Sequence, residues 1–378
     1  MRIALLTDGI FPFVVGGMQK HSFYLAKYLA MNQVYVDLYH TAEKCPEDLF
    51  VFSETERKFI RSIFIPYPKF VKFPGHYLIE QFIYSKRIFS KLNMSINVDF
   101  IYSQGFTGWE TVRQKKRSNT PIGVNFHGLE MFQESPDFIS KLKSYLLRYP
   151  ALQIIKNSDF IFSLGKKLTD LLHKLKVSST KIIQLPIGIG EDWLNDSVVE
   201  KNAREISFLF VGRYERRKGV EELNQALLRI RSPKKIKFYF VGDIPDTKKS
   251  SFDNAIYFGK ISDQIELKKI YKNCAVLICP SHAEGMPTVI LEAMASGLAI
   301  LATDVGAVAE LVDFSNGFLM KESSEDNILK GIEFFVNSES DVISQMKRRS
   351  IEKVKNGFLW QQVVQDLLTK IKNESHKV

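Results

Sequence analysis

The sequence has little cysteine and no long apolar run. Among its 378 residues are three cysteines, at 45, 274 and 279. They are too few and too irregularly placed for a disulfide framework, and Cys274 and Cys279 lack the spacing of zinc ligands. No segment approaches the roughly 18 apolar residues of a membrane-spanning helix, and the apolar N-terminal stretch stops at Thr7-Asp8, unlike a signal peptide. We therefore expect a cytoplasmic protein that does not cross a membrane.

Motifs for a nicotinamide cofactor and for a metal are also missing. The sequence Gly188-Ile189-Gly190 is not a G-x-G-x-x-G fingerprint, because Trp193 occupies the position of its third glycine. Asp-x-Asp occurs nowhere, and no His/Cys cluster is present. We therefore expect neither dinucleotide redox chemistry nor a metal requirement.

The charge of the chain is positive and unevenly distributed. Hydrophobic residues make up 45% and charged residues 25%, which is typical of globular proteins, and the length predicts two to three domains. The net charge is +10, and residues 51–150 contain fifteen Lys or Arg against eight Asp or Glu, a local excess of +7. This region predicts an anionic partner. A nucleic-acid partner is not expected, because no recognition motif accompanies the charge.

Strand-like and helix-like segments alternate along the chain in two series, which predicts two doubly wound parallel sheets. In the first series we predict strands at 1–7, 34–39, 101–102, 123–126 and 160–163 and a helix at 18–30. In the second series we predict strands at 206–211, 237–241, 275–278 and 299–302. We expect residues 1–190 to form an N-terminal domain and 191–359 a C-terminal domain, with the polar stretch 191–204 connecting them. Ligands of such sheets bind beyond the carboxyl ends of the strands, so two facing sheets imply a cleft between domains.

The most informative segment is the loop and helix that follow the strand at 275–278. Pro287 suits the first position of a helix at 288–296, and Gly297 ends it. Free backbone N–H groups are expected here, at Gly285, Met286, Thr288 and Val289. Together with the positive end of the helix dipole, they favour the binding of a phosphate or a sugar. Glu284 precedes the helix and Glu292 lies in its second turn, so both carboxylates can accept hydrogen bonds from ligand hydroxyls. The alternative is that Glu284 only caps the helix and Glu292 is solvated.

A second segment, Gly212-Arg213-Tyr-Glu-Arg-Arg-Lys218-Gly219, follows a strand of the same series and precedes a helix. Arg213 and Lys218 offer a planar fork and a point charge that can hold a diphosphate from two sides. The alternative is a solvated charge run.

Two weaker candidates belong to the first series. Gly16 and Gly17, with Gln19 and His21 close by, form the first strand-to-helix turn, where glycine lets a ligand approach the backbone. His127 follows the strand at 123–126, where a neutral imidazole can hydrogen-bond a sugar hydroxyl. A glycine pair in a sharp turn and a single histidine are also common without any function.

Together these motifs resemble the retaining nucleotide-sugar glycosyltransferases of family 4, which have the GT-B fold of two Rossmann-like domains. The resemblance covers the chain from its first strand to its last helix. It implies that Glu284 contacts the hydroxyls of the donor sugar and Glu292 the ribose, and that Arg213 and Lys218 bind the diphosphate. It also implies that Gly17 approaches the diphosphate and His127 lies by the transferred sugar.

The resemblance extends to two further segments. Tyr257 to Ile261, which includes Lys260, resembles the loop that edges the nucleobase, and residues 360–378 resemble a final helix that crosses back onto the first domain. The chain departs from the family pattern in Pro186-Ile187-Gly188, where Pro-Asn-Gly is frequent, and in His282, where smaller polar residues are common. These departures weaken only the subfamily assignment.

The resemblance implies a reaction in which an NDP-sugar, UDP- or GDP-linked, is the co-substrate and no cofactor is needed. The hexose passes with retention to a saccharide or lipid-linked saccharide in bacterial surface polysaccharide or glycolipid assembly. The stretch 57–92 interleaves Lys/Arg with aromatic residues, which suits an anionic membrane surface on the cytoplasmic side; the alternative is a solvated helix with a buried apolar face. A sugar-nucleotide epimerase and an inactive sugar-nucleotide-binding partner of another transferase remain open.

Overall fold

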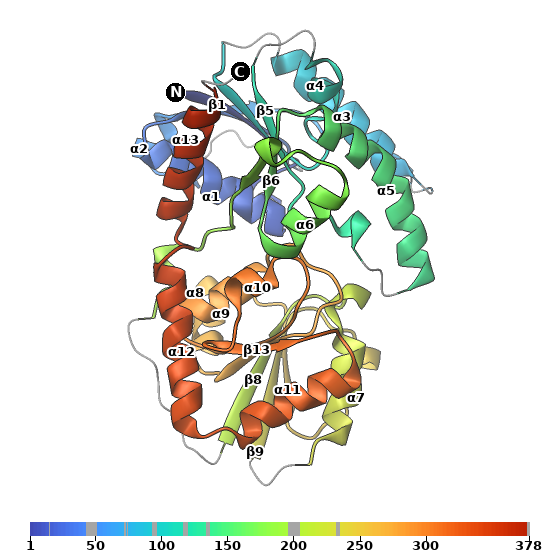
Figure 1. Cartoon of the computed structure of the whole chain (residues 1–378), viewed down its shortest axis with the longest axis vertical. Coiled ribbons are helices and arrows are strands. Elements are labelled where there is room, and N and C mark those ends of the chain that lie inside the picture. The colour runs from blue at the N-terminus through green and yellow to red at the C-terminus, as the bar shows by residue number, and fades with distance from the viewer. Residues whose placement is uncertain are drawn as a thin grey trace. The chain divides into compact units, whose positions relative to one another are not determined.

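A computed structural model describes residues 1–14, 16–42, 51–71, 73, 75–92, 97–115, 120–133, 137–195, 205–231 and 235–375. Cys45, Lys72 and Pro74, and positions 196–204 of the expected connection, lie outside the described residues. The chain divides into two compact units (Figure 1). Unit 1 comprises Met1–Phe132, Leu142–Ile187 and Trp360–Val378, and unit 2 comprises Gln133–Lys141 and Gly188–Leu359. Unit 1 thus gives way to the main segment of unit 2 after Ile187, and the last helix belongs to unit 1.

Unit 1 is built on a seven-stranded sheet in the order β3-β2-β1-β4-β5-β6-β7, and every pair is parallel. The strands are β1 Arg2–Leu6, β2 Tyr35–His40, β3 Ile60–Phe64, β4 Phe100–Gln104, β5 Ile122–Asn125, β6 Phe160–Ser163 and β7 Ile182–Gln184. The helices are α1 Gly17–Met31, α2 Glu54–Arg57, α3 His76–Leu92, α4 Trp109–Arg113, α5 Phe138–Asn157, α6 Lys166–Lys174 and α13 Trp360–Ser375, and the start of α5, Phe138–Lys141, belongs to unit 2.

Successive side chains along the strands of unit 1 point to opposite faces of the sheet, and both faces are apolar. Ala4 and Ile101 pack against residues of α3 and α5 such as Tyr84 and Ile154. Tyr102 faces the other side, where it stacks on His21 of α1. Helix α13 covers α1 on that side, so the end of the chain completes the core of unit 1 (Figure 1).

Unit 2 repeats the plan with a six-stranded sheet in the order β10-β9-β8-β11-β12-β13, also parallel throughout. Its strands are β8 Glu205–Val211, β9 Lys235–Val241, β10 Ala255–Gly259, β11 Val276–Cys279, β12 Ala299–Thr303 and β13 Gly317–Met320. Its helices are α7 Val220–Arg229, α8 Gln264–Lys272, α9 Thr288–Ala295, α10 Val308–Leu311, α11 Glu325–Asn337 and α12 Ser340–Lys355.

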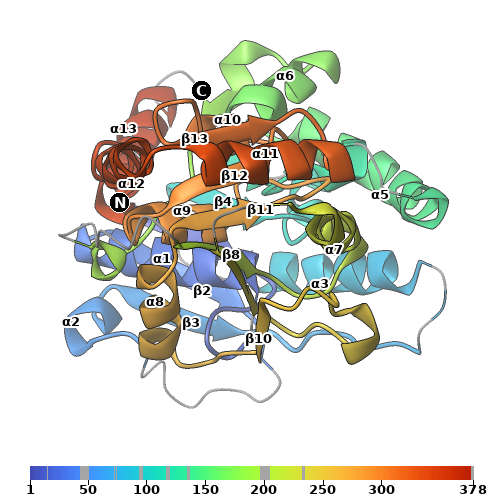
Figure 2. The same ribbon diagram turned by 90° about the horizontal axis from the view of Figure 1, so that it is seen from below.

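The sheet of unit 2 is covered on both faces, with α7 and α11 packed together and α9 against α12 (Figure 2). Phe208, Phe238 and Ile278 point toward α7 and α11, and they belong to one buried cluster with Leu223 and Phe335. Both faces of the sheet are thus buried, which is why these strands are continuous apolar runs in the sequence.

The predicted doubly wound sheets are confirmed, with differences at particular elements. Strands β3, β7 and β13 were not predicted. Tyr257-Phe258-Gly259, interpreted as a loop, forms the end of the edge strand β10. Pro287 is not the first helical residue of α9; it is the N-cap residue in extended conformation, and α9 begins at Thr288.

Candidate functional site

The strand order of each sheet reverses at one seam, and several of the predicted site residues follow the strands that form these two seams. In unit 1 the seam lies between β1 and β4, and in unit 2 it lies between β8 and β11. At such a switch point the loops that leave neighbouring strands diverge to opposite faces and leave room for a ligand. Gly16-Gly17 follow β1, and Gly212–Gly219 and Glu284 follow β8 and β11.

In unit 2, Gly219 brings the loops after β8 and β11 into contact. Gly219 has φ +69°, the left-handed region that favours glycine, and a Cβ there would lie 1.9 Å from the carbonyl oxygen of Pro280. The backbone N–H of His282 donates to the carbonyl oxygen of Arg217 at 2.7 Å. The absence of a side chain at Gly219 therefore allows the turn Arg216–Lys218 to lie directly on the Glu284 loop.

The contact places Lys218 against Glu284. The Lys218 ammonium lies 2.6 Å from one carboxylate oxygen of Glu284, which also accepts a hydrogen bond from Ser281 at 2.8 Å. The Arg217 guanidinium lies 3.4 Å from the other oxygen. Glu284 is buried, which raises the pKa of its carboxyl, but the charges of Lys218 and Arg217 outweigh this effect and leave that pKa below its ordinary value. Glu284 is thus a buried, ionised group held by two cations.

The interpretation of Glu284 as a helix cap is wrong. The N-cap of α9 has no side-chain hydrogen bond, so the Glu284 carboxylate is committed to the cations and not to the helix. The N–H groups of the first turn of α9, which begins at Thr288 beside Gly285, are without a side-chain cap, as the predicted anion-facing end requires. Met286 is buried, and Val289 is partly exposed.

Glu292 is also not solvated. It is 4% exposed and accepts a hydrogen bond from the Tyr271 hydroxyl at 2.9 Å. Tyr271 packs edge-to-face on Trp193, with ring centroids 5.5 Å apart. Burial, together with the Glu292 carboxylate, raises the pKa of the Tyr271 phenol far above its ordinary value, so Tyr271 remains a hydrogen-bond donor. The expected alternatives, a helix cap for Glu284 and a solvated side chain for Glu292, are therefore both wrong.

Arg213 does not join the cluster around Glu284. Its guanidinium pairs with Glu215, and its side chain is 77% exposed. Arg217, which was not predicted, is the arginine that reaches Glu284, and it also contacts Glu215 at 2.9 Å. The only feature of the sequence that could have indicated Arg217 as a site residue is its position in the charged run Arg216-Arg217-Lys218.

The other predicted site residues of unit 2, Gly212, Lys260 and Ile261, lie close to the same edge of its sheet. A Cβ on Gly242 would lie 2.0 Å from the carbonyl oxygen of Gly212, so the ends of β8 and β9 approach closely. The N–H of Gly242 in turn donates to the carbonyl oxygen of Gly259, the end of β10. Lys260 follows directly and is exposed, and Ile261 is partly exposed.

In unit 1, His127 sits at the end of β5 in the left-handed region, with φ 61°. Its backbone N–H donates to Asn125 Oδ1 at 2.8 Å, and its Nε2 lies 2.5 Å from Gln104 Oε1. Because an amide oxygen only accepts, Nε2 carries the proton and Nδ1 is the basic nitrogen. Burial lowers the pKa of His127 to about 4, so the ring is neutral near pH 7.

His21 of α1 packs against His127. Their ring centroids are 4.7 Å apart at a steep angle, and His21 also contacts Trp360 of α13. Burial, with a contribution from His127, lowers the pKa of His21 well below its ordinary value. Gly16 and Gly17 begin the same helix, and a Cβ on Gly17 would meet nothing within 4 Å, so its backbone is open to a ligand. The structure thus brings His21 and His127 together.

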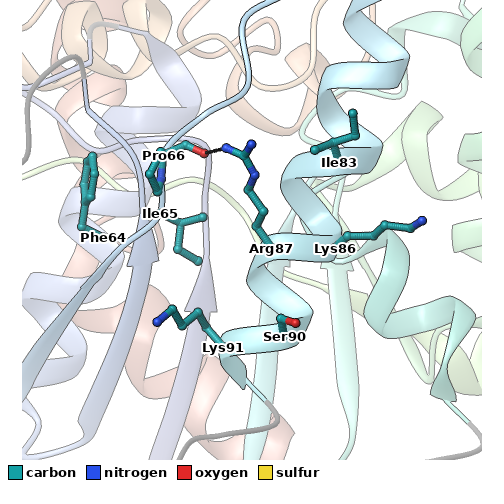
Figure 3. Close-up of a pocket in the computed structure, with 8 residues that line it drawn as sticks. All are labelled: Phe64, Ile65, Pro66, Ile83, Lys86, Arg87, Ser90 and Lys91. Atoms are coloured by element: carbon teal, nitrogen blue, oxygen red, sulfur yellow. Dashed lines mark hydrogen bonds between the residues drawn. The ribbon is translucent and has the colours of Figure 1, made fainter.

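The stretch 57–92 contains both a buried face and exposed aromatic residues. Tyr84 and Ile88 of α3 are buried in the core, whereas Phe70, Phe73 and Tyr77 are 46%, 45% and 42% exposed. Part of the stretch lines a pocket of about 530 Å³ (Figure 3). Its lining consists of three cations and five other residues: Lys86, Arg87, Lys91, Phe64, Ile65, Pro66, Ile83 and Ser90. None of the described residues that line this pocket is a carboxylate.

The described residues contain neither a candidate membrane span nor a candidate metal cluster. None of the helices they form is both long and apolar enough to cross a membrane. No three His, Cys, Asp or Glu side chains in the described ranges are arranged to hold a metal ion.

Comparisons with known proteins agree with this architecture. Residues 192–356 match the model of the glycosyl transferases group 1, and residues 15–193 match that of glycosyltransferase family 4. An uncharacterized glycosyltransferase of Methanocaldococcus jannaschii is 26% identical over 343 residues, 84% of this chain and 85% of the relative. A putative teichuronic acid biosynthesis glycosyltransferase of Bacillus subtilis is 25% identical over 186 residues, 47% of each chain.

Solved structures share the fold. Sucrose-phosphate synthase of Thermosynechococcus elongatus superimposes with a TM-score of 0.80 at 17% identity and covers 100% of both chains. The Anabaena protein HepE, solved in complex with UDP and glucose, has a TM-score of 0.67 at 15% identity, covering 99% of this chain and 100% of that one. The two sheets have the architecture of these structures, and the two family models together span almost the whole chain. The protein is a glycosyltransferase that belongs to family 4 and has the GT-B fold.

Proposed function

We propose that the protein transfers a hexose from an NDP-sugar, UDP- or GDP-linked, to a saccharide or lipid-linked saccharide acceptor with retention of configuration and without a metal. The observation that carries the proposal is the buried pair of Lys218 and Glu284 at the switch point of unit 2, with Arg217 beside it. A carboxylate that accepts hydrogen bonds suits sugar hydroxyls, and cations at the same place suit a diphosphate.

The cations have a further role in the proposed reaction. When the NDP leaves, negative charge concentrates on its β-phosphate, and fixed positive groups stabilise that charge as it develops. Lys218, Arg217 and the uncapped N–H groups at the start of α9 are in the same loop region, and Arg213 is close by in sequence and accessible. A cationic clamp of this kind performs the charge stabilisation for which other transferases use a divalent ion.

For the remaining predicted residues we propose the ligand contacts that the family resemblance implies. Glu292, held by Tyr271, contacts the ribose; Lys260 and Ile261 edge the nucleobase; and Gly17, whose backbone is open, approaches the diphosphate. His127 is neutral near pH 7 and hydrogen-bonds the transferred sugar. The UDP and glucose in the complex of the Anabaena relative support a nucleotide-sugar donor.

On the acceptor side, the name of the Bacillus relative supports a role in the assembly of a cell-surface polysaccharide. The pocket lined by Lys86, Arg87 and Lys91 supports an anionic acceptor or anionic surface, as the +7 excess of residues 51–150 predicts. We place the protein on the cytoplasmic face of the membrane as a peripheral protein.

The proposal is tested in two steps. A thermal-shift screen of UDP-, GDP- and ADP-sugars identifies the donor, because a ligand that binds only the folded chain raises the midpoint of unfolding with concentration. A product assay with that donor then decides the reaction. Transfer to an added saccharide supports the proposal, release of an isomerised NDP-sugar without acceptor shows an epimerase, and binding without turnover under all acceptors shows an inactive partner.

Site variants test the cationic clamp itself. Lys218→Ala and Arg213→Ala are each expected to lower kcat by about 10² or more, by analogy with other groups that stabilise developing charge. Full turnover in both variants, with intact folding, would refute the clamp.

A further inference from the structure

Gln104 contacts the ring of His127 and sets which of its nitrogens carries the proton. It is the last residue of β4, one of the two strands that form the seam of unit 1, and its side chain is buried. Its Oε1 lies 2.5 Å from His127 Nε2. An amide oxygen has no proton to give, so this contact requires a proton on Nε2 and leaves a lone pair on Nδ1.

The backbone of His127 is fixed by a second set of contacts. Asn125 Oδ1 accepts the backbone N–H of His127 at 2.8 Å, and Asn125 Nδ2 donates to the Tyr102 hydroxyl at 2.9 Å. Asn125 and Tyr102 are both buried. They hold His127 at φ 61°, in the left-handed region that a residue with a Cβ rarely adopts. His127 is therefore held at its backbone by Asn125 and at its ring by Gln104.

The amide of Gln104 is bonded at one end only. Its Nε2 group is buried and has no hydrogen-bond partner among the described residues. Burying an amide donor without a partner costs free energy, so a glutamine that served only the stability of unit 1 would be expected to use both ends of its amide. The contact between Oε1 and His127 is thus the one that accounts for a glutamine at this position.

Nδ1 of His127 is left to accept a hydrogen bond from a ligand. The ring is partly exposed, and within the described ranges Nδ1 has no hydrogen-bond partner, whereas the unpartnered Nδ1 of His21 is buried. Burial lowers the pKa of His127 to about 4 and also keeps His21, the titratable ring packed against it, neutral. A neutral ring with its proton on Nε2 can only accept at Nδ1.

We propose that Gln104 is a positioning residue that holds His127 as the Nε2–H tautomer, so that Nδ1 accepts a hydrogen bond from a hydroxyl group of the transferred sugar. The sugar must then present a hydroxyl to Nδ1, and a carboxylate in that place is rejected because neither group has a proton to share. The identity of the ligand rests on the proposed function, whereas the tautomer does not depend on it.

The tautomer is measured by heteronuclear NMR of the full chain labelled with nitrogen-15 in its histidines, because protonated and unprotonated ring nitrogens give well separated signals. The chain has seven histidines, and the signals of His127 are those that disappear in His127→Asn. The wild type should show a neutral ring with its proton on Nε2 near pH 7. A proton on Nδ1 in the wild type would overturn the proposal.

Two substitutions of Gln104 move the proton. Gln104→Met removes the acceptor, so both tautomers of His127 should be populated. Gln104→Glu keeps the shape of the side chain, and the buried pair is neutral overall either as carboxylate with imidazolium or as carboxylic acid with imidazole. Both arrangements place a proton on Nδ1, so this nitrogen can no longer accept. The matched control is Gln81→Met, at another buried glutamine of unit 1, and it should leave the His127 signals unchanged.

The ligand contact is measured on the same signals. UDP-glucose, GDP-mannose and ADP-glucose are each compared with UDP, GDP and ADP. The sugar nucleotide that binds should shift the Nδ1 signal of His127 in the wild type, and the matching nucleotide alone should not. With that donor, kcat should fall about three- to tenfold in Gln104→Met, where the hydrogen bond to the sugar is weakened, and about tenfold or more in Gln104→Glu, where it is lost.

The failures of the two proposals are distinguishable. An unchanged kcat in Gln104→Glu, with the proton shown to be on Nδ1, would refute the role of the tautomer. A donor that is turned over without shifting the Nδ1 signal would refute the sugar contact alone. A sugar-dependent shift of Nδ1 in a chain that transfers to no acceptor would refute the transferase proposal and leave the contact standing.

Discussion

Removal of the Lys218 ammonium should destabilise unit 2 through the carboxylate that it leaves behind. Glu284 is 5% exposed, and in Lys218→Met it would keep Ser281 at 2.8 Å and Arg217 at 3.4 Å but lose its 2.6 Å ion pair. Breaking a buried pair from one side costs about 3 to 5 kcal/mol when no other partner remains, and the remaining partners reduce this to about 2 to 3 kcal/mol.

The measurement must report on unit 2 alone. The chain has three tryptophans, and only Trp193 belongs to unit 2. In a Trp109→Phe, Trp360→Phe background, urea unfolding followed by tryptophan fluorescence therefore monitors the unit that contains Glu284. Trp193 packs on Tyr271 and is buried, so its emission will change on unfolding.

Two comparisons isolate the interaction energy between Lys218 and Glu284. Glu284→Gln in the Lys218→Met background removes the uncompensated charge and should restore stability, giving a coupling energy of about 1 kcal/mol or more in the double-mutant cycle. Arg213→Met is the matched control, because its pair with Glu215 is exposed and should be worth about 0 to 1 kcal/mol.

The pH dependence has a definite sign. The pKa of Glu284 in the folded chain lies below its ordinary value of 4.5, so its contribution to stability is present above pH 4.5 and is lost as the pH falls through the folded-state pKa. The difference between the wild type and Lys218→Met should therefore be largest near neutral pH and shrink below pH 4.5. A coupling energy under about 0.5 kcal/mol, or a difference that does not change with pH, would refute the reasoning.

Three further predictions follow from named contacts. Gly219→Ala should lower the stability of unit 2 by about 2 kcal/mol more than Gly259→Ala in the same fluorescence assay, because both glycines have φ +69° but only a Cβ at 219 meets backbone, at 1.9 Å; equal losses would contradict this. Tyr271→Phe should cost about 1 to 3 kcal/mol, since the buried Glu292 loses a hydrogen bond, and it should weaken NDP-sugar binding by calorimetry; an unchanged affinity would count against the ribose contact of Glu292. Because the pKa of His127 is about 4 in the folded chain and near 6.5 when unfolded, its contribution to stability is complete above pH 6.5 and is lost toward pH 4, up to about 3 kcal/mol; His127→Asn should flatten this part of the stability profile, and a profile identical to the wild type would show that the ring is not held neutral.

Some features of the molecule were readable from the sequence because they depend on local patterns. The central strands of both sheets are apolar runs buried on two faces, and turn residues separate them from helices of 3.6-residue period, so two doubly wound sheets could be predicted. Parallel strands end at a common edge, which also predicted that the loops holding Lys218 and Glu284 lie at the same edge of one sheet. The edge strands β3 and β7 were missed because they are short and contain polar residues, and β13 was missed because it is short.

Other features were decided by contacts between residues distant in the sequence. Lys218 and Glu284 are 66 residues apart, and whether Arg213 or Arg217 joins them depends on the single turn Arg216–Lys218 and on the missing Cβ of Gly219. The Tyr271 hydroxyl that holds Glu292 comes from another helix, and no spacing rule predicts it.

Helix α5 shows the same limit on the surface. Its sequence places apolar residues on more than one face, so periodicity alone does not tell which of them enter the core. The sequence determined that α5 is basic and free of carboxylates. Only the tertiary structure decided that Ile154 and Ile155 are buried and Leu142 and Tyr149 are not, because burial depends on which face the sheet covers and how far the helix extends beyond it.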